Sequence, residues 1–255
     1  MTTSVRQARR PATAPRRRTA TRRSVPGWAV AVAGVLGALT IAAVVLLTAG
    51  HRDTAAGTPA PLPPPPTAVV AEINGQAIPV REFTLYLAQE RAATFAHFQQ
   101  AYGVSDGPDF WTTPHGGTTP AAYARKLALA EVTKATVVLG LAHRHGLIAD
   151  PGYDAFLTSW TAENARRSQA VADHQVVYGP VQYTEANYLS YVLHDLDAQL
   201  ETKLAENGTI AVPDRLSGQA RQAYVHERYQ AMTAQLARSA RTHIARAVYD
   251  AVPVN

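Results

Sequence analysis

The chain has 255 residues, enough for one medium-sized domain with appended segments, and it contains no cysteine. The lack of cysteine excludes disulfides, thiolate metal sites, a cysteine nucleophile and a lipid-modified N-terminal cysteine. The net charge of +5 is unevenly distributed, because residues 1–24 hold eight arginines and no acidic residue. The other 16 Lys and Arg stand against all 19 Asp and Glu, so the basic character belongs to the N-terminal tail.

Residues 28–50 form an uncharged apolar segment that begins at Trp28. As a helix, 23 residues span roughly 34 Å, which matches the hydrocarbon core of a bilayer. Arginines lie on its N-terminal side. By the positive-inside rule we expect a basic cytoplasmic tail over residues 1–27, a single-pass transmembrane signal-anchor over 28–50, and an extracytoplasmic remainder at the cell membrane.

Other interpretations of the N-terminal region remain open. Cleavage near residues 48–50 or 54–56 would make residues 28–50 a signal peptide and the protein secreted, although signal peptides have shorter apolar stretches. Arg22-Arg23 could belong to a twin-arginine signal, but Pro26 and Gly27 follow where such a signal needs apolar residues. The basic tail could also bind nucleic acid, but the adjacent apolar segment favours a role in membrane topology, so no nucleic-acid partner is expected.

Residues 51–67 contain six prolines, four of them consecutive. Such a sequence favours an extended polyproline II conformation that acts as a semi-rigid spacer. A ligand for a proline-binding module is the alternative. We expect a Pro-rich extracytoplasmic tether.

The next segment, "AVVAEINGQAIPVREFTLYL", predicts two short strands joined by Asn74-Gly75, since both residues tolerate the positive φ of a type I′ turn. Helical spacing of apolar residues follows to the end of the chain. We therefore predict a mostly α fold, a single domain over residues 68–255 of about five helices opened by a small β-hairpin. The expected helices are 80–102, 121–145, 151–174, 185–206 and 214–251. Two strands are not stable alone, and "TIAVP" or the terminal "AVPV" could supply a third strand or cover an edge.

Two short motifs resemble the SurA/PrsA family of extracytoplasmic foldases. The opening one is Ile73-Asn74-Gly75 with Glu82-Phe83, and the later one is Val212-Pro213-Asp214 followed by Tyr224 and Tyr229. The resemblance covers roughly residues 68–230. It implies a chaperone module similar to the N-terminal domain of SurA. We expect the parvulin isomerase domain common in the family to be absent, because only 29 residues follow His226 and they show a helical pattern.

We expect no catalytic residue, no metal site and no cofactor. His143 and His145 lie two apart, so on a helix they point to different sides. His194 and Asp197 could share a face, but two ligands make a weak site. His226 and Glu227 are interpreted as a solvated pair.

The predicted peptide-binding residues are aromatic side chains in two interhelical segments: Phe110, Trp111, Tyr178, Tyr183 and Tyr188. Aromatic residues among turn formers could line a groove for extended polypeptide. Packing in the core is the alternative.

The predicted function is that of a membrane-anchored chaperone-like protein that binds unfolded or extended segments of secreted polypeptides, without prolyl isomerase activity. Its expected partners are those polypeptides and, through residues 28–50, membrane lipid. Two alternatives remain: a dedicated partner-binding module of a cell-envelope complex, and an enzyme related to peptidyl-prolyl isomerases with an unrecognised site.

Overall fold

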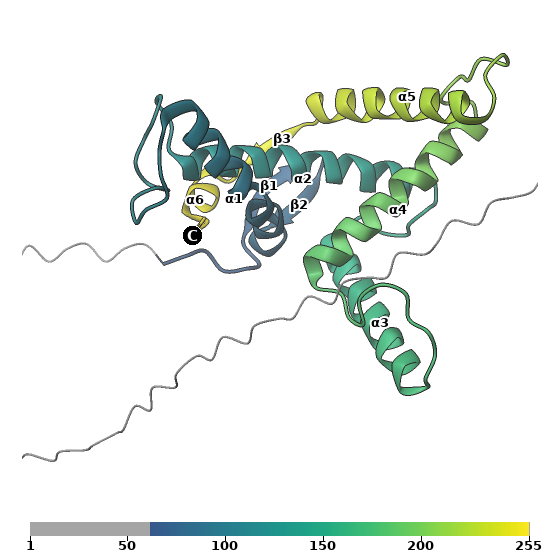
Figure 1. Cartoon of the computed structure of the whole chain (residues 1–255), viewed down its shortest axis with the longest axis horizontal. Helices are drawn as coiled ribbons and strands as arrows, with labels where there is room; N and C mark the ends of the chain where they lie inside the picture. The colour runs from purple at the N-terminus through teal and green to yellow at the C-terminus, as the bar shows by residue number, and fades with distance from the viewer. Residues whose placement is uncertain (1–61, 255) are drawn as a thin grey trace, which may run out of the picture. The chain divides into compact units, whose positions relative to one another are not determined.

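The computed structural model describes residues 62–254. Six helices and a three-stranded sheet make up this part of the chain, which is mostly helical as predicted (Figure 1). The elements are β1 (Val69–Ile73), β2 (Gln76–Pro79), α1 (Val80–Tyr102), α2 (Pro120–Arg144), α3 (Tyr153–Ala172), α4 (Glu185–Glu206), α5 (Gly218–Arg238), β3 (Thr242–Ile244) and α6 (Arg246–Ala251).

The predicted transmembrane anchor over residues 28–50, the basic tail and most of the tether lie outside the described residues. None of the helices within residues 62–254 combines the length and the apolar character that crossing a bilayer requires.

Asn74 and Gly75 form the predicted turn between β1 and β2. Their φ angles of 52° and 87° lie in the left-handed region that a type I′ turn requires. The strands pair antiparallel with Ile73 opposite Gln76. The hairpin prediction is confirmed, and Pro79 leads directly into α1.

The prediction of one helical region over residues 214–251 is wrong. α5 ends at Arg238, and β3 then pairs antiparallel with β1, which gives the strand order β2-β1-β3. The Asn74 N–H donates to the Arg241 carbonyl at 2.8 Å, and the Arg241 N–H donates to Asn74 Oδ1 at 3.0 Å. Without β3, β1 would leave a row of backbone groups unpaired, so this pairing outweighs the local helical pattern.

Neither segment suggested as a third strand takes that role. Ile210 of "TIAVP" packs in the core among α2, α4 and α5. Val252 and Val254 of "AVPV" are buried in the core around the sheet, and the Arg125 guanidinium donates two hydrogen bonds to the Val252 carbonyl. The end of the chain therefore covers the sheet core with side chains.

The remaining helix boundaries agree with the periodicity to within about two residues. α3 begins at Tyr153, and its N-cap is Gly152 rather than Asp150. Asp150 instead accepts the Gly152 N–H at 2.7 Å just before the helix.

Two hydrophobic clusters share α2. The first joins the sheet, the start of α1, the first half of α2 and the chain end. The second joins the last turns of α2 to α4 and α5. α2 therefore links the end that contains the sheet to the end from which α4 and α5 extend.

Replacing Val252 by alanine tests the role of the chain end. Val252 is fully buried, so Val252→Ala should lower the free energy of unfolding by about 1.5–3 kcal/mol. Val176→Ala, at an exposed position, should change it by less than about 0.5 kcal/mol. Urea denaturation measures both, and equal effects would contradict a packed chain end.

Candidate functional site

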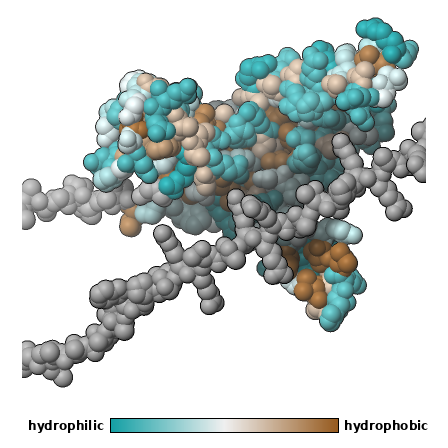
Figure 2. All heavy atoms as spheres, viewed as in Figure 1, coloured by the Kyte–Doolittle hydropathy of each residue, from teal (hydrophilic) through white to brown (hydrophobic). Residues whose placement is uncertain are grey.

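α3 packs on α4, and the loop of residues 173–184 connects the two helices. We call α3 together with this loop the arm. Three apolar side chains of the loop are exposed: Val176 by 77%, Tyr178 by 83% and Val181 by 58%. Figure 2 shows apolar surface gathered in the region where Figure 1 places α3. Apolar side chains that gather on the surface of a folded domain are typical of a binding site.

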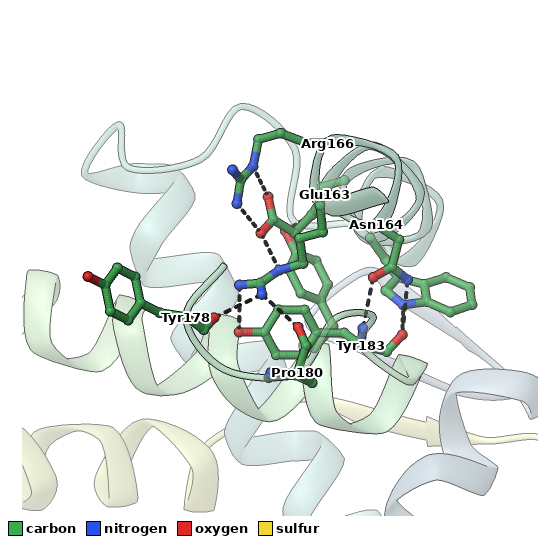
Figure 3. Close-up of polar contacts among 10 residues, drawn as sticks. Glu163, Asn164, Arg166, Tyr178, Pro180 and Tyr183 are labelled. Carbon is green, nitrogen blue, oxygen red and sulfur yellow. Dashed lines mark hydrogen bonds and ion pairs between the residues drawn. The ribbon is translucent and has the colours of Figure 1, made fainter. Parts of the chain in front are cut away.

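Polar side chains of α3 hold the backbone of this loop. The Asn164 amide accepts the Tyr183 N–H at 2.8 Å and donates to the Tyr183 carbonyl at 2.9 Å. The Trp160 Nε1–H donates to the same carbonyl at 2.9 Å. By its spacing in the sequence, Asn164 falls on the apolar face of α3. These hydrogen bonds explain why a polar residue occupies that position: it anchors the loop (Figure 3).

Arg167 supplies the second set of contacts. Its guanidinium donates to the carbonyls of Tyr178 and Pro180 at 2.9 and 2.7 Å, and it lies 4.4 Å from the centre of the Tyr183 ring. Glu163 accepts hydrogen bonds from both Arg166 and Arg167. These hydrogen bonds, that from Arg166 most strongly, lower the pKa of the Glu163 carboxyl group. Figure 3 shows the Tyr178 ring pointing away from these contacts. The loop backbone is thus anchored while its apolar side chains face outward.

Aromatic rings connect the loop to the base of the arm. Tyr183 lies 5.5 Å from Tyr188, Tyr188 lies 5.7 Å from Phe156, and Phe156 stacks on Tyr153 at 5.6 Å. Tyr191 packs beside Tyr183 at 5.6 Å and is half exposed. Of the five predicted binding residues, the structure therefore brings together Tyr183 of the arm and Tyr188 of α4, whereas the Tyr178 ring lies on the same loop outside these contacts. Tyr188 is buried, and its role there is packing.

Phe110 and Trp111 lie elsewhere, in the loop between α1 and α2. Phe110 is 3% exposed, and its ring packs against Phe95 and Phe98 of α1. Trp111 is partly buried against the first cluster, with the Arg91 guanidinium 5.3 Å from its ring centre. Only Trp111 of this pair offers accessible surface, so peptide binding at this loop stays a prediction.

The polar candidates do not converge on one site. The His226 ring lies 2.8 Å from Glu201, on another helix, rather than pairing with Glu227. Asp197 accepts the Tyr229 hydroxyl, and burial raises its pKa. Within residues 62–254 no group of three or more His, Asp or Glu side chains is arranged to hold a metal ion.

A cleft with a volume of about 300 Å³ lies at the base of the arm. Its walls are mainly apolar, and its polar lining residues are Glu82 of α1, Tyr153 and Ser159 of α3, and Asp150 just before α3. Glu82 and Tyr153 are buried. Burial raises the pKa of Glu82 from its ordinary value of 4.5 to about 8. We call this the Glu82 cleft. Its principal apolar walls are Leu139, Ile148, Phe156, Leu189 and Val192.

The chain is similar to a chaperone for lacto-N-biosidase from Bifidobacterium longum subsp. longum, with 27% identity over 116 residues. The match covers 46% of this chain and 41% of the relative, so the chain spans less than half of the relative's length. No protein-family model and no solved structure matches the chain. The likeness is consistent with a chaperone-like role in general. It does not bear on the SurA/PrsA resemblance, which stays a prediction.

The sequence analysis missed Val176, Val181 and Glu82. The two valines flank Tyr178-Gly179-Pro180 in a break between helices, and apolar residues placed beside turn formers were a usable signal. The sequence gives no sign that Glu82 is buried. A glutamate in the first turn of a helix is ordinarily exposed, where its negative charge interacts favourably with the helix dipole.

Arg167→Met tests whether the polar contacts hold the loop. The substitution removes the donors to two loop carbonyls, so the Tyr183 amide should exchange its hydrogen at least about tenfold faster. Arg166→Met is the matched control, because Arg166 pairs with the same Glu163 but its side chain is 63% exposed. Hydrogen exchange measures both, and equal protection in the two variants would contradict this role.

Glu82→Gln tests the burial of Glu82 through pH. The folded-state pKa lies above the ordinary value, so the folded chain keeps this proton where the unfolded chain has lost it. The stability contributed by this group is complete below about pH 4.5 and disappears as pH rises to about 8. Relative to Glu82→Gln, the parent chain should lose on the order of 4 kcal/mol across this window. All other ionisable groups are common to both proteins. A constant difference would contradict the burial.

Proposed function

We propose that the protein is a membrane-anchored, extracytoplasmic chaperone-like protein that captures exposed apolar segments of secreted polypeptides on its arm. The observation that carries the proposal is the loop of residues 173–184, which exposes Val176, Tyr178 and Val181 on an anchored backbone. The proposal includes no prolyl isomerase activity, and affinity comes from removing apolar surface from water.

The anchored backbone supports binding because the loop loses little conformational freedom when a partner docks. A flexible loop would have to be ordered at that moment, which costs free energy. The tyrosine adds an apolar ring with a polar tip, which suits contacts with varied segments. The arm is therefore suited to reversible, non-covalent capture.

The likeness to a chaperone for lacto-N-biosidase supports the general class and favours a second proposal, that the arm serves one dedicated client. Chemical crosslinking of the full chain in its own cell envelope distinguishes the two. One stoichiometric partner would favour the dedicated client, and many substoichiometric partners would favour general capture.

The triple variant Val176→Ser, Tyr178→Ser, Val181→Ser tests the arm. The full chain should suppress light scattering by thermally unfolding citrate synthase. The triple variant should lose most of that suppression, because the apolar contact surface is gone while the anchoring groups of α3 remain. Tyr102→Ser, which removes an exposed tyrosine off the arm, should behave like the parent. Full suppression by the triple variant, or none by the parent at molar excess, would refute the proposal.

A further inference from the structure

Two of the residues that line the Glu82 cleft carry buried polar groups. Glu82 is 5% exposed, and burial is what shifts its pKa. The Tyr153 hydroxyl is buried with no hydrogen-bond partner in the described part of the chain. Buried polar groups are ordinarily hydrogen-bonded, so the unpartnered Tyr153 hydroxyl, on a residue that lines the same cleft as a buried glutamate, indicates a ligand that supplies a partner.

The chemistry of these groups defines that ligand. A protonated carboxyl group offers one O–H donor and a carbonyl acceptor, and a tyrosine hydroxyl can donate or accept. A peptide unit offers one N–H donor and one C=O acceptor, which complements this pair. The apolar walls formed by Leu139, Phe156 and Val192 favour an uncharged side chain beside that peptide unit.

Charged occupants fit less well. An acidic side chain would place a second carboxyl group beside Glu82 in an apolar site, which disfavours its ionised form. A basic side chain would lose its hydration in the cleft, where burial opposes ionisation of Glu82 and where the Asp150 carboxylate already accepts the Gly152 N–H.

We propose that the Glu82 cleft is a specificity pocket that takes one apolar, uncharged side chain of the client polypeptide together with its adjoining backbone amide. This proposal rests on the proposed function. The cleft shares Tyr153 and Phe156 with the aromatic row of the arm. Tyr183 packs on Tyr188 and Tyr188 packs on Phe156, so packed aromatic rings join the loop to the wall of the cleft.

Fluorescence anisotropy on the full chain at pH 7 tests the pocket. The probes are short fluorescein-labelled peptides that differ only in a central Leu, Glu or Lys. The Leu peptide should bind at least about tenfold more tightly than the other two, since only it fills the apolar walls without desolvating a charge. Ala155→Trp, which adds a ring to the cleft lining without removing a contact, should abolish this preference.

Three controls make the result decisive. Ala155→Leu adds a smaller side chain to the cleft than Ala155→Trp does. It replaces Ala155→Trp in the test if the tryptophan variant does not fold. Glu82→Gln keeps a donor and an acceptor, so it should retain the Leu preference, whereas Glu82→Leu should weaken Leu-peptide binding.

Equal binding of the three peptides, tighter binding of the Lys peptide, or an unchanged preference in the filled cleft would contradict the proposed pocket. If citrate synthase aggregation is still suppressed through the loop, only the pocket fails; if suppression is absent too, the proposed function fails.

Discussion

The hydrogen bonds from α3 to the backbone of residues 173–184 are the constraint on which the binding surface depends. A loop must satisfy its backbone polar groups or leave them to water. Here Asn164 and Arg167 supply partners from a neighbouring helix. Because the backbone is held in this way, the loop keeps its shape without burying its own apolar side chains. Val176, Tyr178 and Val181 consequently stay exposed on an ordered segment.

The sheet has a different role, which is to close the domain. β3, from near the end of the chain, pairs with β1, from near the start of the domain. Through β2 and Pro79 the same sheet fixes the entry of α1, and this places Glu82 in the first turn against the base of the arm. A carboxyl group in that position is costly to ionise, because burial disfavours its charged form.

A structural feature could be predicted from the sequence where the contacts that determine it lie between residues close together in the chain. The Asn74-Gly75 turn and the helices 80–102 and 185–206 follow from local signals, and the structure reproduces them. β3 does not, because its stability comes from a partner about 170 residues away in sequence. The polar character of Asn164 was visible, but its partner, the Tyr183 backbone, is set by how the loop returns to α3. Phe110 and Tyr178 read alike as loop aromatics, although one is buried and the other exposed.

The central claim is that client polypeptides contact the exposed side of the arm loop. Site-specific photo-crosslinking tests it most directly, with a benzophenone side chain introduced in place of Tyr178 and, as the control, in place of Glu227, which is exposed on α5. Both full-length chains are irradiated with unfolding citrate synthase under conditions in which aggregation is suppressed. The account predicts a crosslinked adduct from position 178 and little from position 227. Equal adducts from both positions, or none from position 178 while suppression persists, would contradict it.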